Sequence, residues 1–304
     1  MTKTKVFIDG ESGTVGLNIR ERLNNRTDLD ILKIAPELSE NADERRKYLT
    51  QADFVFLCLP DEVAKQSVAM VDESSRAGEV RIIDASTAHR INPNWTYGFP
   101  ELSAEHSERI RKSVRVATPG CYASGFIALV QPLVAYGLLD KSELISCFGV
   151  SGYSGAGKAF ISEYESESRN PELTSARLYA LSQSHKHQPE MRVICGLEHD
   201  PMFNPIIDDY YNGMIVCVPL QRPEFTIGQV RELYGKHYGS AGSRVELKSG
   251  DDITFLAANT LANSDDMELY VFGNDERMLL AARFDNLGKG ASGAAVQCFD
   301  LMRS

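Results

Sequence analysis

Several features that would place a sequence in a special class are missing from this chain of 304 residues. It has no apolar run near 18 residues, so the sequence predicts no transmembrane helix. Its beginning, MTKTKVFIDG, enters a strand-like run at once and lacks the apolar segment of a signal peptide. Basic residues are outnumbered, and the formal net charge of -10 argues against non-specific binding to DNA or to a membrane surface.

Zinc-type spacing is also missing. The six cysteines form no CxxC pair and no Cys/His ligand pattern, so the sequence predicts no metal site. Five of them lie in apolar, strand-like runs or in the last helix, where free thiols behave as small hydrophobic side chains. This usage indicates a reduced, cytoplasmic protein. The five are Cys58, Cys147, Cys195, Cys217 and Cys298.

What is present fits a soluble globular protein with 43% hydrophobic and 24% charged residues, and the length suits two domains. The stretch KVFIDGESGTVGLNIRERL predicts a strand, a glycine-rich turn and an amphipathic helix. Gly10 permits the turn, Gly13 lets a pyrophosphate approach the backbone, and Gly16 lets the helix pack on the strand. The candidate cofactor-binding residues are Gly10, Ser12, Gly13, Thr14, Val15 and Gly16.

The next hundred residues alternate between strand-like and helix-like runs. Strands are predicted over 29–35, 52–60 and 78–86, with helices over 41–51 and 61–76. This βαβα order predicts an α/β fold, a Rossmann-type doubly wound parallel sheet. A Rossmann-like domain without a cofactor is the alternative.

The choice between NAD and NADP stays open at this point. An acidic residue after the second strand would bind a ribose 2′-hydroxyl, and a basic one would favour a 2′-phosphate. Lys33 lies in that strand and Glu37 just beyond it, so the residues point both ways.

After about residue 117 the pattern changes. A helix predicted over 125–139 is followed by strands separated by turns, among them MRVICGLEH at 191–199. This order predicts an α+β second domain. We expect a Rossmann domain of residues 1–117 plus 285–304, and a catalytic, substrate-binding and oligomerisation domain of residues 118–284.

Cys121 stands apart from the other cysteines. In ATPGCYASG it follows a Pro-Gly turn and precedes a helix that we expect to begin near Tyr122 or Ala123. The N–H groups and positive dipole end of a helix favour a thiolate and stabilise an oxyanion. Cys121 is therefore predicted to be a nucleophile, with an incidental turn cysteine as the alternative. His185 and His187 in SHKHQPE are the best candidates for its base, although an exposed histidine pair is often inert.

A nucleotide fold, a nucleophilic cysteine and a histidine together indicate one chemistry. The thiolate attacks an activated acyl group to give a thioester, which hydride from a nicotinamide reduces to an aldehyde.

Seven segments spread along the chain form a specific set of motifs: GESGTVG (10–16), DASTAHR (84–90), YGFPEL (97–102), ATPGCYASG (117–125), VSGYSGAGK (150–158), HKHQPE (185–190) and NLGKGASGAAVQ (286–297). In these motifs the whole chain resembles the short form of the N-acetyl-gamma-glutamyl-phosphate reductase family. One departure is Ser124, where the family's cysteine motif usually has threonine, and the hydroxyl is retained.

The resemblance implies a Rossmann domain with an inserted α+β catalytic domain, similar to aspartate-semialdehyde dehydrogenase and glyceraldehyde-3-phosphate dehydrogenase. It also implies NADPH as cofactor and the third step of arginine biosynthesis. It implies that Cys121 carries the acyl group and that His187 is the acid/base, with His185 in reserve. Lys158 is implied as a phosphate or carboxylate contact. Arg90 is a weaker candidate that could instead be an exposed loop arginine.

The expected partner is a small-molecule substrate, with neither nucleic acid nor membrane, in a homo-oligomer, a dimer or a tetramer. Two other functions stay open. A related acyl-phosphate reductase such as aspartate-semialdehyde dehydrogenase would share the cysteine. A non-catalytic NADP-sensing regulator would bind the nucleotide without turnover.

Overall fold

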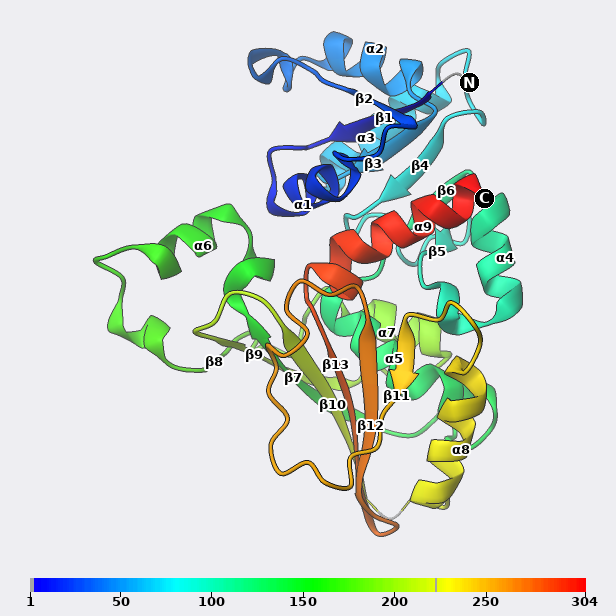
Figure 1. The fold of residues 1–304 in the computed structure, drawn as a ribbon, viewed down its shortest axis with the longest axis vertical. Coiled ribbons are helices and arrows are strands. Elements are labelled where there is room, and N and C mark those ends of the chain that lie inside the picture. Colours follow the sequence, from blue (N-terminus) through cyan, green and yellow to red (C-terminus); the bar gives the residue numbers. More distant parts are fainter. Residues whose placement is uncertain (1–2, 222) are drawn as a thin grey trace. The chain divides into compact units, whose positions relative to one another are not determined.

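The structure is a computed structural model that describes residues 3–221 and 223–304. This part of the chain forms two compact units, each with its own sheet (Figure 1). The first unit comprises the described residues up to Pro100, together with Glu105–Pro119 and Ala291–Ser304. The second comprises Glu101–Ala104 and Gly120–Gly290.

The first unit contains a parallel sheet of six strands in the order β2-β1-β3-β4-β6-β5. Its central strands are short apolar runs, and β3 is buried along its whole length. Such continuous burial is typical of parallel strands that have helices on both faces. The strands are β1 (Thr4–Asp9), β2 (Leu29–Leu32), β3 (Phe54–Leu57), β4 (Arg81–Asp84), β5 (Thr96–Tyr97) and β6 (Arg115–Ala117).

Helices cover both faces of this sheet. One face packs against α1, α4 and α9, where Phe299 lies edge-on to Phe54 at a centroid distance of 4.9 Å. The other face packs against α2 and α3. The predicted doubly wound parallel sheet is confirmed. The helices are α1 (Thr14–Leu23), α2 (Ala42–Gln51), α3 (Asp61–Asp72), α4 (Ala104–Lys112) and α9 (Gly293–Arg303).

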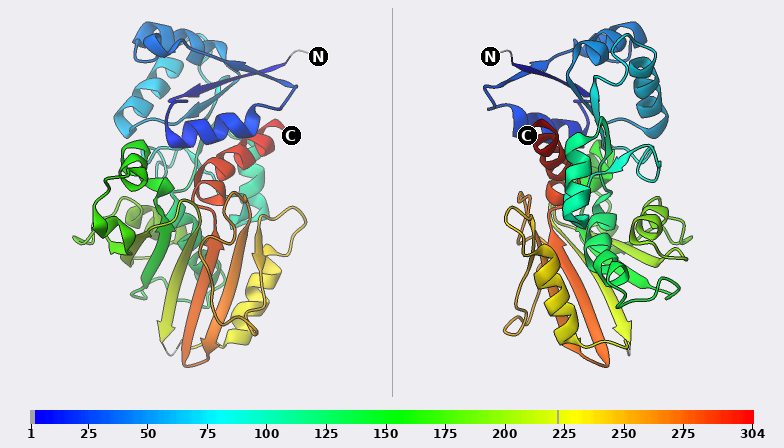
Figure 2. Two further views of the ribbon diagram at one scale, coloured as in Figure 1. Left: turned by 60° about the vertical axis from the view of Figure 1, so that its left-hand side comes forward. Right: turned by 90° about the vertical axis from the view of Figure 1, so that its right-hand side faces the viewer.

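The second unit contains a mixed sheet of seven strands in the order β11-β12-β13-β10-β7-β9-β8. In the right-hand view of Figure 2, α5 and α7 lie on one side of this sheet and the β11–β12 connection lies on the other. The strands are β7 (Ser146–Gly152), β8 (Arg177–Leu178), β9 (Met202–Asp208), β10 (Met214–Gln221), β11 (Val245–Leu247), β12 (Met267–Asn274) and β13 (Arg277–Phe284), and the helices are α5 (Cys121–Ala135), α6 (Lys158–Glu165), α7 (Gln188–Cys195) and α8 (Ile227–Tyr238).

Helix α5 is the centre of the second unit. It is buried on nearly all sides, and it packs against β10, β13, α7 and α8. Gly125 permits the closest approach, because a Cβ atom there would lie 2.7 Å from Val216 and 2.8 Å from Phe284. The first residue of α5 is Cys121, so the core of this unit holds the candidate nucleophile in place.

The strand predicted over 191–199 is wrong, because most of that stretch is helix α7. Pro189 lies in the first turn, where its missing N–H costs nothing, and Gly196 ends the helix with φ 73°. Met191 and Cys195 are buried one turn apart, which is helical spacing.

Among the helices of the described residues, none combines the length and the apolar character that a membrane span needs.

Candidate active site

Cys121 lies at an open helix end. The N-cap of α5 is Gly120, in an extended conformation (φ -76°, ψ 148°), and glycine has no side chain with which to cap the helix. The N–H of Ser124 bonds back to the carbonyl of Gly120 at 2.9 Å, so the earlier N–H groups of the turn lie outside the helical ladder. Their partial positive charge favours a thiolate and could stabilise an oxyanion beside it.

The other cysteines have different surroundings. All six are free thiols; Cys121 and Cys58 are partly exposed, and the other four are buried. Burial raises the pKa of Cys217 to about 12, and it raises the pKa of Cys58, Cys147 and Cys195 well above the ordinary value. These four thiols therefore stay protonated at neutral pH.

One hydrogen bond joins the start of α5 to α7. The N–H of Gly120 donates to Oε1 of Glu190 at 2.8 Å, and Glu190 is 2% exposed. Glu190 lies in the first turn of α7, and His187 is the N-cap residue of that helix. This bond therefore fixes the turn that carries Cys121 against the helix whose N-cap is His187.

The two histidines differ in environment. His187 is 5% exposed and His185 is half-buried, so the expected exposed pair is wrong for His187. The backbone N–H of His187 donates to Nδ1 of His185 at 3.1 Å, so that ring nitrogen acts as an acceptor. His185 is thus held by the backbone.

Tyr122 packs both histidines against α5. Its ring centroid lies 6.2 Å from that of His185 and 6.2 Å from that of His187. Its hydroxyl bonds to Oγ of Ser151 at 2.8 Å and donates to the carbonyl of Ile206 at 3.1 Å. The residue next to the nucleophile thus connects α5, the histidine segment and the sheet.

Two further tyrosines bring hydroxyl groups to this region. The ring of Tyr179 lies 6.4 Å from that of Tyr122. Burial raises the pKa of Tyr179, and the nearby Cys121 raises it further, so the phenol remains a neutral donor. The hydroxyl of Tyr210 is buried and has no hydrogen-bond partner among the described residues. Burial raises the pKa of Tyr210, and Tyr122 adds to that shift.

Sequence reasoning did not find Glu190, Tyr179 or Tyr210. Glu190 has a local signal, because an acidic residue after proline is typical of the first turn of a helix. The two tyrosines have no such signal. Tyr179 directly follows β8 and Tyr210 lies just after β9, and the pairing of these two strands within the sheet determines where both residues lie.

Lys158 and Arg90 have contrasting surroundings. Lys158 is exposed and begins α6, directly after Gly157 with φ 90°. Arg90 is 9% exposed, so the alternative of an exposed loop arginine is wrong. Its Nε donates to the carbonyl of Thr118 at 2.9 Å and its Nη2 to that of Ala85 at 3.3 Å. Arg90 therefore supports the segment that leads to the Pro-Gly turn.

In the first unit, the glycine-rich turn fits a dinucleotide. A Cβ atom on Gly10 would lie 2.4 Å from the carbonyl oxygen of Cys58, and one on Gly16 would lie 2.4 Å from that of Gly10, so the fold itself requires both glycines. A Cβ atom on Gly13 would meet only ordinary contacts, the nearest at 3.4 Å. Thr14, at the start of α1, buries a hydroxyl that has no partner among the described residues. The space beside Gly13 and this hydroxyl fit a bound phosphate group.

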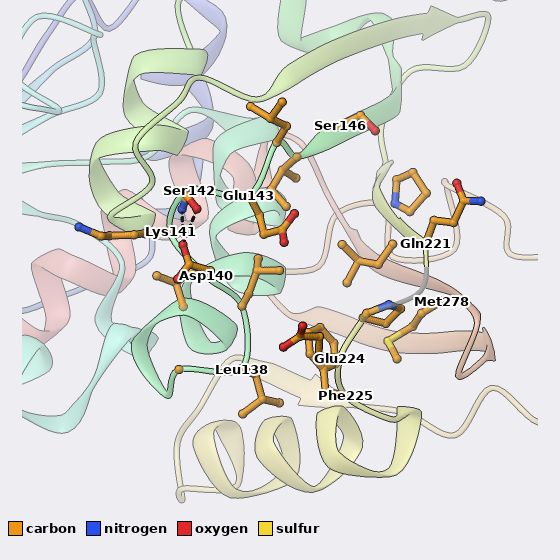
Figure 3. A pocket seen from close by; sticks show the side chains of 18 of the residues that line it. Leu138, Asp140, Lys141, Ser142, Glu143, Ser146, Gln221, Glu224, Phe225 and Met278 are labelled. Carbon is orange, nitrogen blue, oxygen red and sulfur yellow. Dashed lines mark hydrogen bonds between the residues drawn. The ribbon is translucent and has the colours of Figure 1, made fainter.

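A surface cavity of about 1380 Å³ lies elsewhere in the second unit (Figure 3). It is lined by Asp140, Lys141 and Glu143 before β7, and by Gln221 and Glu224 at and after the end of β10. In the sheet register Met214, at the start of β10, pairs with Ser151, which holds Tyr122. The cavity therefore lies at the opposite end of these strands from Tyr122.

Among the described residues, no cluster of three or more His, Cys, Asp or Glu side chains could hold a metal ion.

Two family models match the chain. The NAD binding domain of semialdehyde dehydrogenase matches residues 35–110, and the dimerisation domain of semialdehyde dehydrogenase matches residues 121–286. Solved structures agree in fold. Aspartate semialdehyde dehydrogenase II of Vibrio cholerae superimposes with a TM-score of 0.73 at 19% identity, covering 100% of this chain and 99% of that one. The enzyme of Francisella tularensis gives 0.74 at 14% identity, over 99% and 100% of the two chains.

Curated relatives are more similar in sequence. The N-acetyl-gamma-glutamyl-phosphate reductase of Rhizobium meliloti is 45% identical over 313 aligned residues, which cover 99% of each chain. That of Chelativorans sp. is 42% identical over 99% of this chain and 98% of its own. The chain therefore belongs to the N-acetyl-gamma-glutamyl-phosphate reductase family.

Proposed function

We propose that this protein reduces N-acetyl-gamma-glutamyl phosphate to N-acetylglutamate 5-semialdehyde and phosphate with NADPH, the third step of arginine biosynthesis. The relatives carry that activity in their names. The observation that supports it most is the hydrogen bond from Gly120 to Glu190, since it holds the helix that begins at Cys121 against the helix whose N-cap is His187.

The first step forms a thioester. The thiolate of Cys121 attacks the acyl phosphate carbon, the carbon–sulfur bond forms, and the carbon–oxygen bond to phosphate breaks. Negative charge that develops on the carbonyl oxygen is stabilised by the N–H groups of the first turn of α5, near Tyr122 and Ala123. Inorganic phosphate leaves with the bonding electrons.

The second step forms the aldehyde. NADPH, when bound, supplies the hydride that reduces the carbonyl carbon of the thioester. The imidazolium of His187 gives its proton to the oxygen as the thiohemiacetal forms, and the neutral ring then takes a proton back as the carbon–sulfur bond breaks. The products are the aldehyde and the thiolate of Cys121.

The glycine-rich turn would hold the cofactor. Gly13 leaves room for the pyrophosphate, and the open N-terminus of α1 provides N–H donors and the positive end of the dipole. Ser12, Thr14 and Val15 complete the loop between Gly10 and Gly16. NADPH rather than NADH is proposed from the resemblance to the family.

Three polar side chains are proposed to contact the substrate. Lys158 suits a phosphate or a carboxylate, because its ammonium is exposed at the positive end of α6. His185 lies beside Tyr122. Arg90 stays the weaker candidate, since two backbone carbonyls already accept from its guanidinium.

The protein is further proposed to be cytoplasmic and a homo-oligomer, a dimer or a tetramer. The family model over residues 121–286 describes a dimerisation domain. On the sheet face opposite α5, Phe148, Ile215 and Phe272 are only partly buried. In the connection between β11 and β12, Phe255 is 88% exposed. A second copy of the chain would cover this face. A monomer at micromolar concentration in analytical ultracentrifugation would contradict the proposal.

One assay tests the activity. N-acetylglutamate 5-semialdehyde, inorganic phosphate and NADP should give NADPH, and the rate should fall to the background when phosphate is omitted. NAD in place of NADP tests the cofactor, and aspartate semialdehyde tests the related reductase. Binding of NADPH with no phosphate-dependent turnover would instead support a nucleotide-sensing regulator.

A further inference from the structure

A buried ion pair lies within the second unit. Nζ of Lys289 is 2.8 Å from Oε1 and 2.7 Å from Oε2 of Glu101. The two side chains are 1% and 5% exposed. Removing both charges from water is costly, and buried ion pairs are often no more stabilising than apolar side chains of similar volume. Stability alone is therefore a weak explanation for this pair.

Lys289 lies in a tightly held segment. It belongs to the π-helical turn Gly288–Ser292, a geometry that is often found at functional sites. The carboxylate of Asp285 accepts from the N–H of Leu287 at 2.6 Å and of Gly288 at 2.8 Å, and the N–H of Gly290 donates to the carbonyl of Asp285 at 3.0 Å. These bonds fix the backbone on either side of the lysine.

The residue after Lys289 touches the nucleophile. A Cβ atom on Gly290 would lie 3.0 Å from Cβ and 3.4 Å from Cα of Cys121. The backbone of Gly290 therefore packs directly on the cysteine, and a Cβ atom there would make a tighter contact than most Cβ atoms do. A small displacement of this segment would change the position of Cys121.

Glu101, the other member of the pair, makes two further hydrogen bonds within the second unit. Nε2 of His237, on α8, bonds to the carbonyl of Glu101 at 2.9 Å, and the N–H of Arg244 donates to Oε1 at 3.3 Å. Helix α8 packs against α5, so the glutamate is anchored to the helical layer that carries Cys121.

We propose that the Glu101–Lys289 pair is a positioning device that holds the backbone of Gly290 against Cys121 and so fixes the thiol at the start of α5. This role rests on the proposed function, in which Cys121 is the nucleophile. Neither charged group contacts the substrate in this scheme. The pair acts through Gly290.

The test replaces both charges at once. In the double variant Glu101→Leu/Lys289→Met, the thermal midpoint should stay near or above that of the native protein. The kcat should fall roughly 10- to 100-fold, because a shift of about 1 Å at a reacting group costs that much, while the KM for NADPH stays unchanged. Alkylation of Cys121 by iodoacetamide, followed by mass spectrometry, should slow at least roughly fivefold.

A matched control uses a buried ion pair of the first unit. Arg45 and Asp9 pair at 2.8 Å and are 7% and 4% exposed. Asp9→Leu/Arg45→Met should leave the alkylation rate of Cys121 unchanged. A folded Glu101→Leu/Lys289→Met protein with native alkylation rate and native kcat would overturn the proposal.

A second variant covers the case in which the double variant does not fold. Gly290→Ala adds one methyl group against Cys121 and should alter the alkylation rate at least roughly fivefold; an unchanged rate would overturn the proposal. The alkylation assay contains no substrate. A native protein without reductase activity would therefore contradict the proposed function and leave the result on positioning intact.

Discussion

Two helices, α1 in the first unit and α5 in the second, begin in the same way. Each has a glycine as its N-cap, Gly13 with φ -74° and ψ 165°, and Gly120 with φ -76° and ψ 148°. Each therefore leaves its first N–H groups to an outside partner. The first residue differs, since α1 begins with Thr14 and α5 with Cys121.

The surroundings of the two helix starts differ as well. Helix α1 has exposed positions such as Leu17 and packs on the sheet by one side, whereas α5 is buried on nearly all sides. Glu190 bonds to the N-cap of α5, and a Cβ atom on the N-cap of α1, Gly13, would meet only ordinary contacts. The two units thus share a helix start that no side chain caps. In the proposed function, the residue at the first position and the neighbouring helix decide whether that start binds a ligand or a reacting thiol.

The largest expected effect comes from changing the first residue of α5. Cys121→Ser should keep the fold and NADPH binding, since a hydroxyl fits the same turn. Turnover should fall on the order of 10,000-fold or more, because an alcohol without a strong base beside it is hardly ionised at neutral pH. Mass spectrometry of the native enzyme mixed with acyl phosphate, without NADPH, should find the acyl group on the peptide that contains Cys121. An adduct on another cysteine would end the covalent mechanism.

The helix that touches α5 provides the second test. His187→Asn should retain the fold and the cofactor but lose roughly 100- to 10,000-fold in turnover, the usual contribution of a general acid–base group. His185→Asn is the matched control and should have the smaller effect, because its Nδ1 already accepts a backbone hydrogen bond. The reverse order of the two kcat values would exchange their roles.

The N-cap glycine of α1, Gly13, provides the third test. Gly13→Val should weaken NADPH binding at least roughly tenfold, equivalent to about 1.4 kcal/mol, because its side chain would occupy the pyrophosphate position. The thermal midpoint without cofactor should change little, since a Cβ atom there meets only ordinary contacts. Gly16→Ala is the contrasting control and should destabilise the protein itself, because its Cβ atom would lie 2.4 Å from the carbonyl oxygen of Gly10. Unchanged affinity in isothermal titration of Gly13→Val would remove the cofactor from this turn.

The smallest expected effect concerns Thr14. Its buried hydroxyl has no partner among the described residues, so Thr14→Val should leave the cofactor-free protein as stable as before or more so. NADPH affinity should fall roughly fivefold, equivalent to about 1 kcal/mol, if the hydroxyl bonds to the cofactor. Equal NADPH titration curves for the native protein and Thr14→Val would show that α1 binds the cofactor without the hydroxyl of Thr14.

Sequence reasoning reached the parts of the molecule that local rules determine. Alternating strands and helices identified the doubly wound sheet, and Pro-Gly before Cys121 predicted a turn and a helix start, which lies at Cys121 itself. Local rules failed at α7, where Val193 and Ile194 favour a strand but packing of Met191 and Cys195 makes a helix. They could not reach Glu190, because its partner Gly120 lies 70 residues away and only the packing of α7 on α5 joins them.

The last helix has a consequence for synthesis. Helix α9 covers one face of the first sheet, with Phe299 against Phe54 and Phe56. The ribosome makes this helix after the whole of the second unit, so the second unit can fold while the first still lacks one of its covering helices. Throughout that interval, the part of the apolar sheet face that α9 covers stays exposed to solvent. The nucleotide-binding unit, although it starts first, is the last to be completed.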